Sequence, residues 1–226
     1  PTAVMFDLGF EGYSHVYGIP EHATPLSLED THGKEPYRMY NLDVFKYLDD
    51  SPAALYGSIP FMWSHKPGSS VGAFFLNSAE MWVDVLKSKG NPQLGTRDRV
   101  GTQWIAESGQ LDLFLLMGPG PADVSRQYAR LTGGTPLPQL FSLGYHQCRW
   151  NYKNEADVSA VDGGFDEHGV PYDVLWLDIE HTDGKRYFTW DKNKFPKPAA
   201  MQDELAARTL TLTLALTLTL ALTLTL

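Results

Sequence analysis

Two carboxylates that follow a buried apolar run are the residues best placed to do chemistry. Asp178 and Glu180 come directly after Val174–Leu177, where all four side chains are apolar. A run that is apolar on both faces is typical of a strand buried in a parallel sheet. In α/β folds, reactive groups collect at the C-terminal ends of such strands. The segment therefore indicates an enzyme, and a site at this strand end.

The spacing of the two acids supports two interpretations. On an extended strand, residues two apart share a face and lie roughly 7 Å apart. That separation falls between those of retaining and inverting glycosidases, which both use a carboxyl pair. In the other interpretation, one acid binds a ligand and the other forms an ion pair with Lys185 or Arg186. Both stay open at this point.

Aromatic residues near these acids favour a sugar as the ligand. A sugar ring offers an apolar C–H face to an aromatic ring, while its hydroxyls suit carboxylates. Trp150 follows Arg149 just beyond a predicted strand and is the better ligand candidate. Trp176 lies inside the apolar run, where we expect it to fill the core.

Composition excludes several other functions. The formal net charge is −9 and no Lys/Arg cluster is visible, which argues against a nucleic-acid partner. The histidines are scattered without metal-ligand spacing, and no nucleotide-binding glycine loop is present, so no metal or cofactor is expected. The single cysteine, Cys148, excludes an internal disulfide and is expected to be a packed strand residue.

The first half of the chain has the pattern of an antiparallel β-sandwich. Short apolar or alternating runs are separated by Gly, Pro, Asp and Asn, which mark turns. The predicted strands include Ala54–Tyr56, Pro60–Trp63, Val71–Leu76, Met81–Leu86 and Leu111–Met117.

The second half has the pattern of a βαβ unit, which implies parallel pairing. Before this unit, and before the domain boundary, a helix is expected over Pro121–Leu131, with Pro121 at its first position and glycines after it. The expected elements that follow are the strand Leu140–Cys148, a helix Asn154–Phe165 with Asn154 as N-cap, the strand Tyr172–Asp178 and a helix from Met201 to Arg208. We therefore expect domains at residues 1–136 and 137–208, and a tail at 209–226.

The tail is a low-complexity Leu/Thr repeat, TLTLTLALTLTLALTLTL. It has the period of a strand, and as a helix it would be near the lower length limit for crossing a membrane. A third interpretation is a coding artefact without a native role. The abrupt change of composition after Arg208 favours the artefact. A membrane is therefore not an expected partner.

Several ordered blocks of the chain resemble glycoside hydrolase family 31. They include HVYGIPEHA, EPYRMYNLDVFKY, LYGSIPFMWSH, LFSLGYHQCRWNY and WLDIEHTDGKRYFTWDKNKFP. The similarity extends over nearly everything from Pro1 to Ala207. It implies a galactose mutarotase-like β-sandwich followed by the first part of a (β/α)₈ TIM barrel, with about two of the eight barrel strands present.

The resemblance implies a retaining α-glucosidase that removes terminal α-linked glucose from oligosaccharides, with N-glycan trimming as its role. For the longer protein it implies the lumen of the endoplasmic reticulum and a regulatory beta subunit as partner. The family's nucleophile and acid/base lie on later strands, so no catalytic residue is expected here and the chain by itself should be inactive. The alternative is a non-catalytic sandwich module that binds carbohydrate or a partner.

The resemblance also assigns substrate contacts by position. Asp178 matches the acid that binds hydroxyls of the terminal glucose, and Ile179 lines the same subsite. Trp150 matches an aromatic beside the neighbouring sugar. Asp43 and Phe45, in NLDVF, match a sandwich loop that reaches over the pocket. Glu180 then supports Asp178 and is not catalytic.

Overall fold

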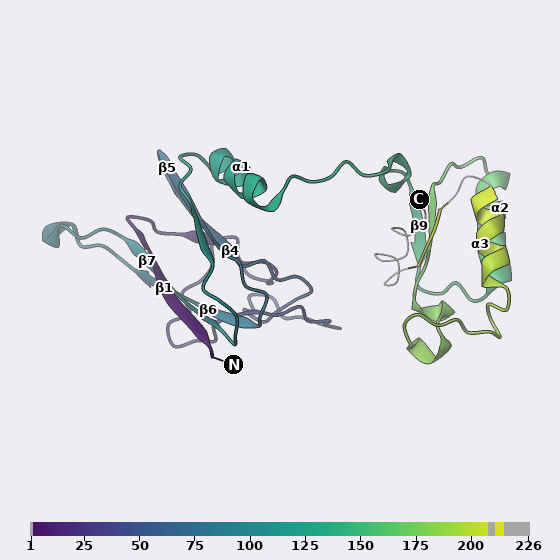
Figure 1. Cartoon of the computed structure of the whole chain (residues 1–226), viewed down its shortest axis with the longest axis horizontal. Helices are drawn as coiled ribbons and strands as arrows, with labels where there is room; N and C mark the ends of the chain where they lie inside the picture. The colour runs from purple at the N-terminus through teal and green to yellow at the C-terminus, as the bar shows by residue number, and fades with distance from the viewer. Residues whose placement is uncertain (1, 208–210, 215–226) are drawn as a thin grey trace. The chain divides into compact units, whose positions relative to one another are not determined.

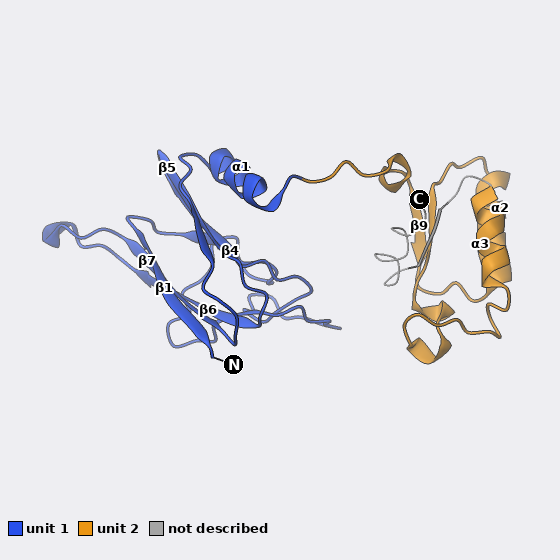
Figure 2. Cartoon of the chain, in the orientation of Figure 1, with its two compact units in different colours: residues 1–134 blue, residues 135–226 orange. Residues whose placement is uncertain are grey.

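The chain divides into two compact units, Pro1–Gly134 and Thr135–Leu226. The structure is a computed structural model that describes residues 2–207 and 211–214. Figure 2 shows the two units in different colours.

The first unit is a β-sandwich of two antiparallel four-stranded sheets. One sheet has the order β1 (Val4–Glu11), β7 (Arg99–Ala106), β6 (Met81–Ser88) and β3 (Tyr37–Met39). The other has the order β2 (Val16–Gly18), β4 (Phe61–Lys66), β5 (Ser69–Phe75) and β8 (Leu113–Leu116). The predicted sandwich is confirmed.

Aromatic and aliphatic side chains from both sheets form one core. In β6, buried and partly buried residues alternate, as the period of two requires. Trp104 of β7 stacks on Phe6 of β1 with ring centroids 5.6 Å apart. Phe75 of the other sheet meets Trp104 edge-on at 6.3 Å. The contact between Phe75 and Trp104 joins the two sheets, whereas the stack of Trp104 on Phe6 lies within one of them.

The predicted strand Ala54–Tyr56 is wrong. These residues lie in a loop whose bonds are local: the carbonyl of Leu55 accepts from Leu42 N–H at 2.7 Å, and Tyr56 Oη donates to Val44 O at 2.8 Å. Ala54 is buried, so the apolar character of this run reflects burial within the loop and not pairing in a sheet. A short 3₁₀ helix, η1 (Pro92–Leu94), lies between β6 and β7.

The helix α1 (Pro121–Thr132) forms where it was predicted and packs beside β5 (Figure 1). Gly120 is its N-cap, and Pro121 occupies the first turn, where no intrahelical bond is lost. Asp123 accepts a bond from Gly120 N–H at 3.0 Å. Gly133 ends the helix with a positive φ of 89°.

The second unit contains a parallel sheet in the order β11 (Thr211–Leu214), β10 (Val174–Leu177) and β9 (His146–Arg149). The helices α2 (Glu155–Glu167) and α3 (Pro198–Ala207) contact each other and lie on the same side of β9 in Figure 1. Leu175 and Leu177 of β10 share a core with Val158, Met201 and Leu205 of the helices. The predicted βαβ unit is therefore present.

Two local predictions in this unit have different outcomes. Leu140–Leu143 is the 3₁₀ helix η2, so the predicted strand from Leu140 is wrong in its first half. Leu140 and Leu143 are 85% and 68% exposed, so their apolar character does not reflect burial in a sheet. Asn154 is the N-cap of α2 as predicted, because its Oδ1 accepts from Asp157 N–H at 2.9 Å.

Part of the Leu/Thr repeat is described, and it forms a strand. Thr211–Leu214 pairs in parallel with β10, with Thr211 opposite Val174. The strand interpretation thus holds for these four residues, and the rest of the repeat lies outside the described residues. Within the described part of the chain, no helix is long and apolar enough to cross a membrane.

Candidate functional site

The end of β10 turns directly into a short helix that presents Asp178. The strand stops at Leu177, and Asp178 is the N-cap of the 3₁₀ helix η3 (Ile179–His181), with its Oδ1 accepting from Ile179 N–H at 2.7 Å. Asp178 and Glu180 are therefore not two residues of one extended strand. The same-face argument for a carboxylate pair is wrong here, because the backbone leaves the strand between them.

The residues after Asp178 fix this turn. The imidazole Nδ1 of His181 lies 2.5 Å from the carbonyl oxygen of Asp178, and His181 is buried against the ring of Trp190. Thr182 Oγ1 donates to Ile179 O at 2.7 Å. A second 3₁₀ turn, η4 (Asp183–Lys185), follows. The backbone that carries Asp178 is thus held by bonds within its own loop.

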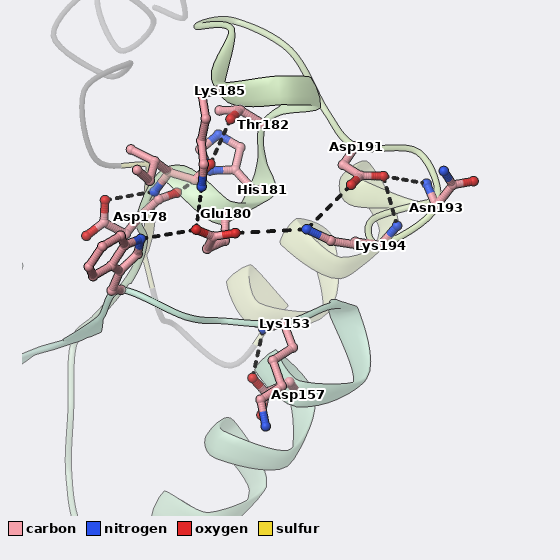
Figure 3. A network of polar contacts seen from close by, with 12 residues as sticks. Lys153, Asp157, Asp178, Glu180, His181, Thr182, Lys185, Asp191, Asn193 and Lys194 are labelled. Atoms are coloured by element: carbon pink, nitrogen blue, oxygen red, sulfur yellow. Dashed lines mark hydrogen bonds and ion pairs between the residues drawn. The ribbon is translucent and has the colours of Figure 1, made fainter.

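Glu180 lies at the centre of a polar network (Figure 3). Its Oε1 accepts from Lys185 Nζ, and also from Trp150 Nε1 at 3.1 Å. Its Oε2 lies 3.9 Å from Lys194 Nζ. The hydrogen bond from Lys185, opposed by desolvation, lowers the pKa of Glu180. Glu180 is therefore the ion-pair member of the two acids, whereas Arg186 pairs with Asp183.

Trp150 reaches this network from the neighbouring strand. The parallel register places Arg149, the last residue of β9, beside Leu177, the last residue of β10. Trp150 and Asp178 therefore follow adjacent strands at the same end of the sheet. We call Trp150, Asp178, Ile179 and Glu180 the strand-end cluster. Trp150 is 66% exposed, so its side chain is accessible to a ligand.

An ion pair that was not predicted from the sequence joins the end of β9, next to Trp150, to α2. Arg149 Nη2 lies 2.5 Å from Asp157 Oδ2 near the start of α2, and the same oxygen accepts from Lys153 N–H at 2.9 Å. The hydrogen bond from Arg149 is the main cause of a lowered pKa of Asp157. The guanidinium also lies 4.6 Å from the centre of the Tyr152 ring. Arg149 lies in β9 and Asp157 in α2, so neither a helical nor a strand periodicity relates the two residues. The sequence pattern therefore does not predict this ion pair.

The Arg149–Asp157 pair should make stability depend on pH. A carboxylate whose folded pKa is lowered stabilises the fold above its unfolded pKa of about 3.9, and this contribution is lost as the pH falls through the lower folded value. We expect Asp157→Asn to lower the melting temperature near pH 6, and the difference from the unmodified chain to shrink below about pH 4. Thermal unfolding across pH checks this. A constant difference down to pH of about 2 would contradict it.

Two expectations about the sheet face near the cluster need correction. Trp176 is only half-buried, and its Nε1 donates to His146 Nδ1 at 2.8 Å, so it is not a plain core residue. Cys148 is exposed and not packed, because the helices cover the other face of the sheet. Desolvation and then the Asp178 charge raise the pKa of Cys148, which disfavours the reactive thiolate.

The sandwich candidates lie in the first unit, in the loop between β3 and β4. Asp43 is exposed, and Phe45 is fully exposed. Because they belong to the other unit, their place in one site with the strand-end cluster stays a prediction. Among the residues that the structure describes, no group of three or more His, Cys, Asp or Glu could hold a metal ion.

Comparison with protein families decides the relationship. The model for the glycosyl hydrolase 31 N-terminal galactose mutarotase-like domain matches residues 1–84, and the model for the glycosyl hydrolases family 31 TIM-barrel domain matches residues 135–221. The chain belongs to glycosyl hydrolase family 31. The sandwich is thus the mutarotase-like domain of this family, and the parallel sheet with its helices is the start of the family's barrel.

Relatives in the family are α-glucosidases. The chain is 56% identical over 212 residues to the neutral alpha-glucosidase AB of Dictyostelium discoideum, covering 92% of this chain and 22% of that protein. It is 52% identical over 219 residues to the human neutral alpha-glucosidase AB, covering 92% of this chain and 23% of the relative. The chain therefore spans about a quarter of the length of the curated relatives it matches.

Solved structures agree with this relationship. The glucosidase II alpha subunit in a DNJ-bound form is 53% identical and superposes with a TM-score of 0.83, over 95% of this chain and 24% of that one. A family 31 dextranase of Flavobacterium johnsoniae is 24% identical with a TM-score of 0.70, over 94% of this chain and 24% of that one. The second similarity concerns the fold only.

Proposed function

We propose that this chain is part of a retaining α-glucosidase that removes terminal α-linked glucose from oligosaccharides. The observation that carries the proposal is the strand-end cluster. An exposed indole and a carboxylate follow two adjacent strands at the C-terminal edge of a family 31 barrel sheet. In TIM barrels, active sites lie at this edge.

The cluster has the chemistry of a sugar subsite. One carboxylate oxygen of Asp178 accepts a hydrogen bond from Ile179 N–H. The remaining lone pairs of the carboxylate can accept hydrogen bonds from ligand hydroxyl groups. The face of Trp150 suits the C–H face of a sugar ring. In our proposal Asp178 and Ile179 line the glucose subsite and Trp150 the neighbouring one, while Asp43 and Phe45 reach over the pocket from the sandwich.

The proposed role of this segment is binding and not bond cleavage. A retaining glycosidase needs a nucleophile and an acid/base whose carboxyl groups lie about 5 Å apart. Glu180 suits neither role, since its carboxylate is engaged by Lys185 and Trp150 and its pKa is lowered, away from that of a general acid. We therefore place both catalytic carboxylates outside residues 1–226.

The proposal also covers the cellular role, compartment and partner of the longer protein. One similar structure is a heterodimeric complex of ER glucosidase II, made of the catalytic subunit and the binding domain of the regulatory subunit. This supports N-glycan trimming, the lumen of the endoplasmic reticulum and a regulatory beta subunit as proposals for the longer protein. We also propose 136 and 208 as the limits of the sandwich and of the barrel segment.

Turnover measurements on two lengths of protein test the proposal. The full-length protein should release p-nitrophenol from p-nitrophenyl α-glucoside, whereas the 226-residue chain should show no release above the uncatalysed rate. The β-anomer of the substrate serves as the control. An inactive full-length protein would refute the α-glucosidase assignment. Release by the 226-residue chain that Asp178→Asn abolishes would refute the division of roles.

A further inference from the structure

We propose that Glu180 is a positioning residue that holds the indole ring of Trp150 in place for stacking on a sugar. The inference rests on the proposed function and goes beyond it. It gives Glu180 a specific task in the neighbouring-sugar subsite, while Asp178 and Ile179 line the glucose subsite.

The contact between the two side chains is specific. The indole N–H is the only hydrogen-bond donor of the Trp150 side chain, and it points at Glu180 Oε1 over 3.1 Å. Since Trp150 is 66% exposed, burial does little to restrict its ring. The bond to Glu180 uses the edge of the ring and leaves its faces open. The ring can therefore be oriented and still be available to a ligand.

Glu180 is itself firmly held, which a positioning residue requires. In Figure 3, Lys185 reaches one oxygen of its carboxylate and Lys194 approaches the other. Lys194 is also 3.6 Å from Asp191, so its position is shared between two acids. The backbone of Glu180 lies within η3. The imidazole of His181, the last residue of η3, contacts the carbonyl oxygen of Asp178, its N-cap. The hydrogen-bond acceptor for the indole is thus fixed before any ligand arrives.

Within the strand-end cluster, Glu180 acts on Trp150 and not on Asp178. The described hydrogen bonds of Asp178 are to Ile179 N–H and, through its carbonyl, to His181. Those of the Glu180 carboxylate are to Trp150 and Lys185. The family-based expectation that Glu180 supports Asp178 is thereby refined, because the side chain that it touches in the cluster is the indole.

Ordering a side chain at an interface weakens binding by about 2- to 12-fold, and this is the cost that a pre-oriented Trp150 avoids. In the full-length enzyme, Glu180→Leu should raise KM for an α-linked glucose disaccharide by about that factor, with kcat changed by less than about twofold. Glu180→Gln keeps an acceptor oxygen for the indole and should recover part of the loss.

A double-mutant cycle with Trp150→Phe separates positioning from a general structural role. Phe keeps the aromatic ring but has no N–H, so Glu180→Leu should change KM by less than about twofold in that background. An equal effect of Glu180→Leu in both backgrounds would overturn the inference. Asp183→Asn is the matched control, because Asp183 lies in the same loop and pairs with Arg186, outside the strand-end cluster. It should leave KM unchanged.

A readout independent of turnover keeps this test separate from that of the proposed function. In a crystal structure of the ligand-free full-length Glu180→Leu enzyme, the Trp150 ring should occupy more than one rotamer. A ring that stays in a single, unchanged position would refute positioning, whatever the activity. Absence of α-glucosidase activity in the unmodified full-length protein would refute the proposed function instead.

Discussion

Replacement of Asp178 by Ala in the full-length protein should lower kcat/KM for an α-glucoside by about a hundredfold or more. A hydrogen bond from a charged group contributes about 1.5–3 kcal/mol, and a carboxylate at the glucose subsite would accept two hydroxyl groups. Because Asp178 is fixed as the N-cap of η3, no neighbouring carboxylate can take its place without moving the turn. The loss should therefore not be recovered at high substrate concentration if the bonds strengthen in the transition state.

The comparison with Asp183→Ala controls for charge and for the loop. Asp183 lies five residues further along, is exposed and pairs with Arg186. Its loss should change kcat/KM by less than about threefold, as for most surface substitutions. Melting temperatures of both variants show whether the fold is kept. A folded Asp178→Ala enzyme with nearly unchanged kcat/KM would remove Asp178 from the substrate site.

Those parts of the fold that depend on local patterns could be predicted from the sequence. Alternation in Met81–Leu86 gave a strand because one face of a sandwich sheet is buried. Pro121 and Asn154 marked helix starts because their covalent structures suit the first turn and the N-cap. The apolar run Val174–Leu177 marked the strand whose end carries Asp178.

The parts that depend on tertiary contacts could not be predicted in this way. The bond between Trp150 and Glu180 joins residues thirty positions apart, and it follows from the parallel register of β9 and β10. The strand ends at Leu177, three residues before Glu180, whereas the same-face argument required extended backbone as far as Glu180. Exposure of Cys148 depends on which face of the sheet the helices cover. None of these three features can be deduced from the spacing of residues in the sequence.

The sandwich should depend strongly on Trp104. This side chain is 1% exposed, stacks on Phe6, meets Phe75 edge-on and donates its N–H to Thr102 Oγ1 at 2.9 Å. Truncating a buried Trp to Ala costs about 3–5 kcal/mol, since a cavity remains between the sheets. A small domain is stabilised by only about 5–15 kcal/mol in total, so Trp104→Ala should remove a large part of the stability of the first unit.

Hydrogen exchange followed by mass spectrometry measures this loss within the sandwich. Peptides from β1 and β7 should exchange faster in Trp104→Ala, because these paired strands flank the cavity. Peptides from α2 should change little, because α2 lies in the other unit and has its own core. Leu26→Ala is the control, since Leu26 is 82% exposed and its loss should stay within about 0.5 kcal/mol. Unchanged exchange in β1 and β7 would show that Trp104 does not hold the sheets together.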